Sequence, residues 1–422
     1  MAQKAKWSAN SISASGYPDR FPHHLEFYPI STQNMVNCWR PANRLDNHGL
    51  AEFARCTMPY SRATRFGPRE EAAKKGSPMK LKRYAILILA SVLGLVMRAD
   101  AQTSGKVHEL HSSPATVHRG FYDASLKPVL TIDSGDSVRV WTTTGNPKYF
   151  ENLGVPKEKI PAELYAAFEG VQDSERGDHT LIGPMYVNGA EPGDTLEIRI
   201  LKVDVWLPIA AQSFRPHRGV LPDEFPYAKD RVMWIDLNKK TIEYAPGVVV
   251  PVKPFWGDIG VAPPPQMGRI ISGPPNINGG NMDNHDLGEG STLYLPVHVP
   301  GALLSLSDGH AVQGDGEVCL AAVETSLKGE IQVIVHKGKR IGWPRAETPT
   351  HYMTMGFDED LNQAAKIATR EMLNFIVETK GLSREDAYML MSATMDLVVT
   401  QAVDGVKGIH ALLPKSIFQN QK

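Results

Sequence analysis

Two segments of the chain share one design, in which a Gly-Asp turn leads into a run of alternating apolar and polar residues. Gly135-Asp136 precedes residues 137–142, and Gly193-Asp194 precedes residues 195–200. Successive side chains of a β-strand point to opposite faces of a sheet, so this alternation predicts half-buried strands. The 36 glycines and 31 prolines among 422 residues also favour a strand-rich, turn-rich fold over a helical bundle.

The C-terminal part of the chain has a different periodicity. Residues 358–379 carry apolar side chains at helical spacing, and residues 383–401 form a second such segment that starts at Ser383. The predicted fold class is therefore α+β: a β-rich body of sandwich-like or barrel-like strands with two helices near the C-terminus.

Three further segments are predicted on local pattern. A short helix is expected within residues 161–170, and residues 208–230 are expected to be irregular. Residues 248–275 are rich in proline and glycine, and so long an irregular segment inside a domain is typical of a functional loop.

The N-terminal region is predicted to be processed. Residues 79–101 combine a basic start, a short uncharged apolar stretch and an Ala-Asp-Ala end, as a secretory signal peptide does. A short membrane anchor is the alternative, although the stretch falls below the roughly 20 residues of a span. Residues 1–78 are then expected to be a non-native or disordered extension, and residues 102–422 are expected to form the mature domain, exported to the periplasm or secreted. Cys319 is the one cysteine of that domain, so it forms no internal disulfide.

The overall charge excludes one class of partner. The formal net charge is −1, which gives no electrostatic reason to bind nucleic acid, because phosphate recognition needs clustered Lys and Arg. Neither a nucleic-acid partner nor a stable membrane anchor is expected.

The densest groups of polar residues occupy residues 279–286 and 307–317, which are expected to be loops on either side of a buried strand over residues 292–306. Glu324 follows a further strand expected at residues 318–323. Asp, His and Glu side chains from such loops can converge on a divalent metal. Asp and Gly together are also ordinary turn residues, so the spacing alone leaves a structural role open.

Four motifs in order resemble the acetamidase/formamidase family. The chain reads GPMYVNGAEPGD at residues 183–194, PFWGDIGVAP at 254–263, GGNMD at 279–283 and DGHAVQGDGE at 308–317. The resemblance covers roughly residues 106–418 and does not account for residues 1–78. It implies hydrolysis of a small linear amide such as formamide or acetamide, and it implies a homo-oligomer.

The motifs and the polar clusters together assign candidate roles. The candidate metal ligands are Asp283, His310, Asp315 and Glu317, for Zn²⁺ in the first place and Ca²⁺ as the alternative. The candidate catalytic residues are Glu324, Asp308, His118 and His179. The candidate substrate-binding residues are Asn281, Gln313 and Trp256, although core packing is the commoner role of a tryptophan.

Two other functions fit the same residues. The first is an exported hydrolase of another amide or of an ester. The second is a non-catalytic protein in which Asp283, Asp308 and Asp315 hold structural Ca²⁺. The identity of the bound metal distinguishes them, because a catalytic zinc site keeps an open coordination position.

Overall fold

The computed structural model describes residues 105–169 and 179–419. They all belong to one compact unit. The expected extension at residues 1–78 and signal peptide at residues 79–101 lie outside the described residues. Within the described part, no helix has the length and apolar character needed to cross a membrane.

The described residues are dominated by strands. The strands are β1 (Val107–His111), β2 (Val117–Arg119), β3 (Phe121–Tyr122), β4 (Leu130–Ile132), β5 (Ser137–Trp141), β6 (Thr180–Val187), β7 (Thr195–Phe214), β8 (Lys229–Asp236), β9 (Thr241–Ala245), β10 (Val248–Pro251), β11 (Phe255–Gly260), β12 (Ile270–Ile271), β13 (Gly279–Asn281), β14 (Thr292–Pro296), β15 (Leu304–Val312), β16 (Val323–His336), β17 (Arg345–Glu347), β18 (His351–Asp358), β19 (Asp396–Gln401) and β20 (Lys407–Pro414). The helices are α2 (Pro147–Asn152), α3 (Ala162–Phe168), α4 (Leu361–Lys380) and α5 (Arg384–Thr394), with 3₁₀ turns η1 (Lys157–Lys159), η2 (Pro265–Met267) and η3 (Lys415–Ile417).

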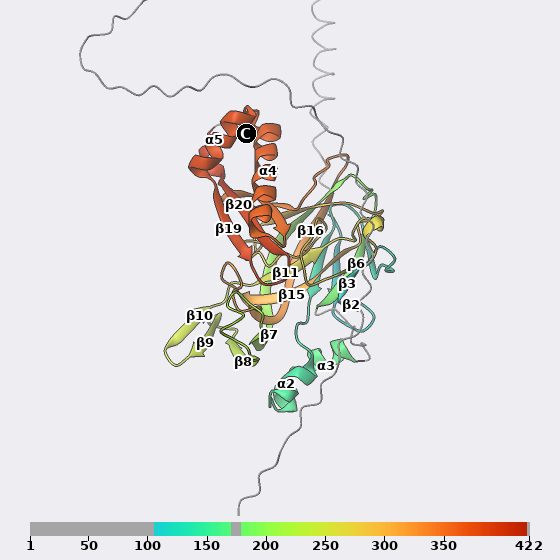
Figure 1. Cartoon of the computed structure of the whole chain (residues 1–422). Coiled ribbons are helices and arrows are strands. Elements are labelled where there is room, and N and C mark those ends of the chain that lie inside the picture. The colour runs from blue at the N-terminus through green and yellow to red at the C-terminus, as the bar shows by residue number, and fades with distance from the viewer. Residues whose placement is uncertain (1–104, 170–178, 420–422) are drawn as a thin grey trace, which may run out of the picture. The chain divides into compact units, whose positions relative to one another are not determined.

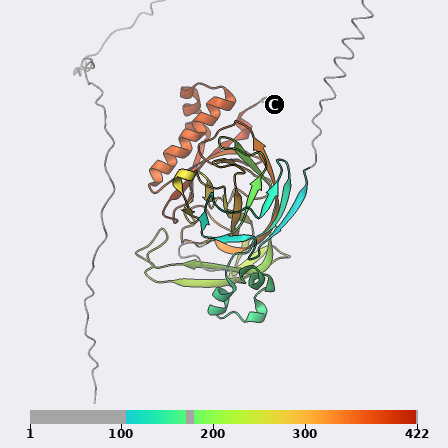
Figure 2. The same cartoon turned by 90° about the vertical axis from the view of Figure 1, so that its right-hand side faces the viewer.

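The long strands β7 and β16 form the spine of the large sheet. They pair antiparallel, with Thr195 opposite His336 at one end and Ala211 opposite Glu324 at the other. β16 also pairs with β5 and β15, while β7 also pairs with β8 and β14. The strands wrap around a common core, and the helices lie at its periphery (Figures 1 and 2). The prediction of an α+β, β-rich fold is confirmed.

The two Gly-Asp turns have the same hydrogen bonding. Asp136 accepts from the backbone N–H of Asp133 at 3.0 Å, and Asp194 accepts from that of Glu191 at 2.8 Å. In each case the carboxylate closes the turn three residues back along the chain. The strands that follow, β5 and β7, both pair with β16, so the shared sequence pattern has a shared structural role.

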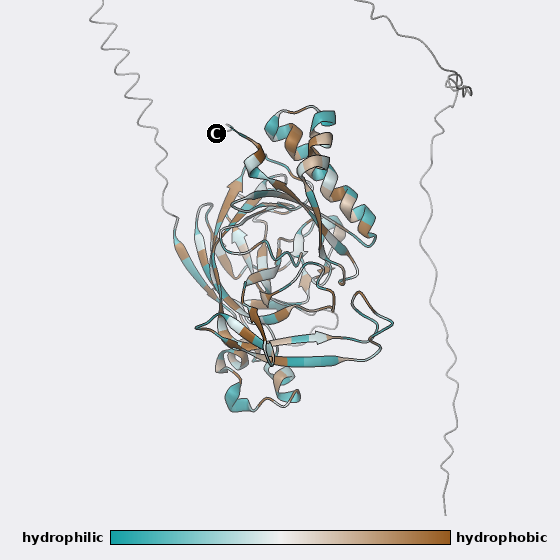
Figure 3. Ribbon diagram, turned by 90° about the vertical axis from the view of Figure 1, so that its left-hand side faces the viewer, coloured by the Kyte–Doolittle hydropathy of each residue, from teal (hydrophilic) through white to brown (hydrophobic). Residues whose placement is uncertain are grey.

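Helix α4 forms where its apolar periodicity predicts it. Asp360 caps the N-terminus by accepting from the backbone N–H of Asn362, and Gly381 ends the helix with a left-handed φ of 68°. One face of α4 packs against β18 and β20, whereas its other face is polar (Figure 3). The buried face carries Ala364, Ala368, Met372 and Ile376.

The second C-terminal helix is shorter than predicted. Ser383 does cap α5, accepting from the backbone N–H of Asp386. The helix ends at Thr394, and residues 396–401 form β19, which pairs with β20. The run Val398-Val399-Thr400 is β-branched, and such side chains favour a strand that a neighbouring edge can pair.

The structure also contradicts the predicted bounds of several loops and strands. The expected irregular segment 248–275 contains β10, β11 and β12, and the segment 208–230 begins inside β7. β11 is buried at every position, so it lacks the alternation that reveals a half-buried strand. The single strand expected over residues 292–306 is two strands, β14 and β15, separated by turns at residues 297–303.

Candidate functional site

An open cavity of about 920 Å³ is lined in part by residues of β6, β13, β15 and β16. Segments distant in sequence line it, from the loop before α2 to the loop between β19 and β20. Its titratable wall residues include His179, Asp283, Asp308, Glu317, Glu324 and Asp404. The cavity is therefore rich in carboxylates that the chain brings together only on folding.

Strand pairing sets the positions of the central side chains. β11 lies between β13 and β15, and Asp258 of β11 is opposite both Asn281 and Ser307. Where β15 meets β16, His310 is opposite Glu324. The loop expected over residues 307–317 begins inside β15, so Asp308 and His310 are strand residues. The strand expected over residues 318–323 is also wrong, because β16 begins at Val323 and Glu324 lies within it.

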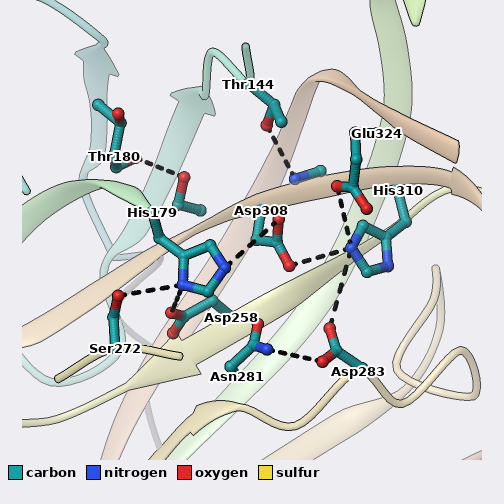
Figure 4. A network of polar contacts seen from close by, with 12 residues as sticks. Thr144, His179, Thr180, Asp258, Ser272, Asn281, Asp283, Asp308, His310 and Glu324 are labelled. Atoms are coloured by element: carbon teal, nitrogen blue, oxygen red, sulfur yellow. Dashed lines mark hydrogen bonds and ion pairs between the residues drawn. The ribbon is translucent and has the colours of Figure 1, made fainter. Parts of the chain in front are cut away.

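His310 is the centre of the cluster and is buried. Its Nε2 lies 3.0 Å from Oδ2 of Asp308, 3.2 Å from Oε2 of Glu324 and 3.8 Å from Oδ1 of Asp283 (Figure 4). Ligand atoms of Asp283, His310 and Glu317 lie within 4.8 Å of one another, and the same holds for Asp308, His310 and Glu324.

The backbone is strained at three of these residues. Asp283, Asp308 and Glu317 have φ angles of 49°, 57° and 44°, in the left-handed region that side chains other than glycine rarely adopt. Such residues concentrate at functional sites, where the surrounding structure holds them against the strain. Their side chains are aimed by the fold rather than by local preference.

Gly257 leaves the space that the cluster occupies. A Cβ at this position would lie 2.4 Å from Oδ1 of Asp283, 2.5 Å from Oδ2 of Asp308 and 2.9 Å from Cε1 of His310. Any side chain here would displace the cluster, so glycine is required by close approach.

Burial controls the charge of most of the carboxyl groups. It raises the pKa of Asp283 and Glu317 well above the ordinary values, with repulsion by neighbouring carboxylates adding to the effect. It likewise raises the pKa of Glu324, and it raises that of Asp404 to about 6. These groups resist ionisation unless a cation joins them.

Asp308 and His310 behave as a pair. Burial alone would raise the pKa of Asp308, but the adjacent His310 and His179 hold it below the ordinary value. Burial alone would lower the pKa of His310, but Glu324 and Asp308 raise it well above the ordinary value. A proton on Nε2 of His310 thus supplies positive charge among the carboxylates.

The donor set fits a divalent cation. Oδ1 of Asp283 and Oε2 of Glu317 are buried without a hydrogen-bond partner among the described residues. On the far side of His310, Nδ1 lies 2.8 Å from Oε1 of Gln313, whose amide donates to the backbone carbonyl of Asp283. This contact orients the imidazole so that Nε2 faces the carboxylates, as the outer partner of a metal-binding histidine does.

A second branch of the network runs through His179. Its Nδ1 lies 3.1 Å from Oγ of Ser272 and 3.4 Å from Oδ2 of Asp258, and its Nε2 lies 4.0 Å from Oδ1 of Asp308. Figure 4 shows His179 and His310 on opposite sides of Asp308. Asp258 belongs to the motif at residues 254–263, but no local signal in the sequence gives it a role.

Asp404 is a further site residue, and it lies outside the four sequence motifs. The amide of Asn281 donates to Asp283 at 2.7 Å and to Asp404 at 3.2 Å, so it bridges two cavity carboxylates. Asp404 precedes Gly405 in what reads as an ordinary turn, and no local signal marks it as a site residue.

Besides His310, which is buried, four candidate residues do not line the cavity. His118 contacts Oγ of Ser305 at 3.0 Å instead. Trp256 is fully buried in the core, where its indole N–H donates to Oγ1 of Thr142. Gln313 contacts Nδ1 of His310, the ring nitrogen that does not face the carboxylates.

Asp315 is the fourth. Its half-exposed carboxylate pairs with Nε2 of His285 at 3.0 Å, so it is not among the converging ligands. Asp315 belongs to neither of the two groups that share His310.

Known proteins show clear similarity to this chain. The sequence profile of the acetamidase/formamidase family matches residues 171–273 and 269–420. The chain is 30% identical over 315 residues to the formamidase of Methylophilus methylotrophus, a match that covers 57% of this chain and 77% of that protein. It is 28% identical over 198 residues to the acetamidase of Mycolicibacterium smegmatis, covering 33% of this chain. The match covers 49% of the Mycolicibacterium smegmatis protein. A match to a relative from Schizosaccharomyces pombe covers 47% of that protein, so each spans about half the length of the relative.

The fold is also similar to solved structures. A crystal structure of an acetamidase from Bacillus halodurans superposes with a TM-score of 0.63 and 31% sequence identity, covering 74% of this chain and 98% of that one. The similarity thus extends over nearly the whole of the solved protein.

Proposed function

The chain belongs to the acetamidase/formamidase family, and from this premise we propose that it hydrolyses the C–N bond of small linear amides to a carboxylate and ammonia. The observation that carries the proposal is the convergence of His310 with Asp283, Asp308, Glu317 and Glu324 at an open cavity. Amides are poor electrophiles and amines are poor leaving groups, so hydrolysis needs groups that polarise oxygen, activate water and protonate nitrogen.

Asp283, His310 and Glu317 are the residues that would hold a divalent cation. Their nitrogen and carboxylate donors suit Zn²⁺, whereas Ca²⁺ prefers oxygen ligands alone. The group formed by Asp308, His310 and Glu324 shares the same Nε2, and one nitrogen ligates one ion, so the two groups are not independent sites. A bound divalent ion would polarise the amide oxygen and lower the pKa of water from ~15.7 toward ~7.

Glu324 and His179 are the candidates for proton transfer. Glu324 lies on the cavity wall beside His310, and its carboxylate can accept a proton from the attacking water. His179 also lines the wall, and its Nε2 can deliver a proton to the departing nitrogen. In each turnover Glu324 gains one proton from water and His179 gives one proton to the departing nitrogen. Both residues regain their starting protonation states when Glu324 returns its proton to His179 through solvent. Asp308, ionised between the two histidines, orients both.

Ammonia release from formamide, acetamide and propionamide by the full chain, with and without a chelator, tests the proposal. Chelator-sensitive release is expected. Asp283→Ala should abolish it, whereas Asp315→Ala is the matched control and should retain it, because Asp315 lies outside the cluster. A folded, metal-loaded protein that releases no ammonia from any amide would overturn the proposal.

The size of the cavity favours a second candidate substrate. Its volume of about 920 Å³ is in the range of pockets that bind far larger ligands than acetamide, which has only a handful of non-hydrogen atoms. A larger amide or an ester is therefore the alternative. Including such compounds in the panel decides between them, and metal analysis separates both from a protein that holds structural Ca²⁺.

Export and self-association stay predictions. The signal peptide at residues 79–101 is tested by N-terminal sequencing of the protein recovered from its natural source. The homo-oligomer is tested by light scattering of the purified chain. Neither result bears on the chemistry of the cavity.

A further inference from the structure

Asp258 is a fully buried carboxylate behind the cavity wall. It lies in the middle of β11, with 0% of the residue exposed. Oδ1 accepts a hydrogen bond from the hydroxyl of Tyr122, which is itself buried. Oδ2 lies 3.4 Å from Nδ1 of His179, and within residues 105–169 and 179–419 no Lys or Arg pairs with Asp258. Isolated burial of a carboxylate is strongly unfavourable, so a position of this kind calls for a specific reason.

His179 supplies that reason, because its two ring nitrogens face different surroundings. Nδ1 faces inward, toward Oδ2 of Asp258 and Oγ of Ser272. Nε2 faces Asp308 across 4.0 Å, and the residue forms part of the cavity wall (Figure 4). The side chain of His179 is 15% exposed, so it reaches solvent at one edge only.

A carboxylate accepts hydrogen bonds and does not donate them, so Asp258 favours a proton on Nδ1 of His179. The hydrogen bond made by one ring nitrogen decides what the other can do. With Nδ1 protonated between Asp258 and Ser272, any proton that His179 exchanges with the reaction passes through Nε2, which lies on the side of Asp308, another residue of the cavity wall. Tyr122 fixes the carboxylate in turn by occupying its other oxygen.

We propose that Asp258, held by Tyr122, is a positioning residue that keeps Nδ1 of His179 protonated and presents Nε2 to the substrate. The inference rests on the proposed amide hydrolysis for its rate predictions, and it adds Asp258 and Tyr122 to the residues that the reaction requires. His179 is the group that touches the substrate, and Asp258 acts only through it.

Steady-state kinetics of Asp258→Asn provide the first test, on the amide that the wild type hydrolyses best. The substitution keeps the shape of the side chain but removes the charge that orients Nδ1–H. A fall in kcat of about 10²-fold or more with little change in KM is expected, since general acid–base catalysis contributes about 10²–10⁴-fold. Tyr122→Phe removes one hydrogen bond and should lower kcat about tenfold.

A double-mutant cycle separates this role from a structural one. In a His179→Ala background, Asp258→Asn should cause almost no further loss of kcat, because residues that act through one another are not additive. Equal losses with and without His179 would overturn the proposal, since they would show that Asp258 supports the fold alone. Circular dichroism and metal content of each variant confirm that folded proteins are compared.

Nitrogen-15 NMR of histidine-labelled protein tests the positioning without activity. His179, identified by the signal missing from His179→Ala, should show a protonated Nδ1 in the wild type and a changed pattern in Asp258→Asn. An identical signal in both proteins would overturn the inference. If the wild type hydrolyses no amide while the NMR result is as expected, the proposed function fails and the positioning by Asp258 stands.

Discussion

Substitution of Gly257 by alanine is the most direct test of the cluster geometry. The added methyl carbon would lie 2.4 Å from one oxygen of Asp283 and 2.5 Å from one oxygen of Asp308, whereas ordinary contacts begin at 3.4 Å. Both oxygens must therefore move by about 1 Å to relieve the overlap. A misplacement of about 1 Å at an active site lowers the rate about 10²-fold, and overpacking costs about 1–3 kcal/mol of stability.

The assay combines kcat for ammonia release, metal affinity by titration and the free energy of unfolding in urea. Gly257→Ala should fold, bind metal more weakly and lose about 10²-fold in kcat. Gly342→Ala is the control, because Gly342 is exposed and a Cβ there meets nothing within 4 Å. Wild-type kcat and metal affinity in Gly257→Ala would refute the reasoning, because the two carboxylates would then not be held at these distances.

Three further predictions follow from the same structure. Asp194→Asn should lower the free energy of unfolding at pH 7 by about 1–3 kcal/mol, because Asp194 accepts from Lys337 and from the backbone N–H groups of Glu191 and Gly338. Burial alone would raise the pKa of Asp194, but these partners hold it below the ordinary value. The stabilising effect of Asp194 is therefore complete above about pH 4 and is lost as the pH falls further. Urea titrations should show a smaller difference in free energy of unfolding between wild type and Asp194→Asn at about pH 3 than at about pH 7. Adding Zn²⁺ to chelator-treated protein should raise its melting temperature. It should also release protons into a weak buffer, because Nε2 of His310 must lose its proton to bind a metal. Binding of Zn²⁺ without proton release would contradict the pairing of His310 with Asp308 and Glu324. Trp256→Phe should lower the melting temperature and leave KM unchanged, because Trp256 packs in the core and hydrogen-bonds to Thr142 rather than lining the cavity; a raised KM without loss of stability would restore it as a substrate contact.

Elements with local signals can be predicted from the amino-acid sequence of this chain. Alternation over residues 195–200 marks the start of β7, although the structure buries both faces of the strand there rather than one. Apolar spacing from Ala364 to Ile376 marks the buried face of α4. The Gly-Asp turns before β5 and β7 follow from short-range hydrogen bonding. These features need only a few neighbouring residues, so they can be read from a short window of sequence. The motifs likewise identified the neighbourhood of Asp283 and His310.

Only the tertiary structure decided which side chains of that neighbourhood meet. The register of β15 against β16 places His310 beside Glu324, and the pairing of β11 with β13 and β15 brings in Asp258. A shift of one residue in a strand register turns a side chain to the opposite face, and no local pattern reports register between distant strands. Asp315, which has the same chemistry as Asp283, lies beyond the end of β15 and is half-exposed beside His285. Asp404 lies 123 residues from Asn281 in the sequence, and only folding brings the two side chains into hydrogen-bonding contact.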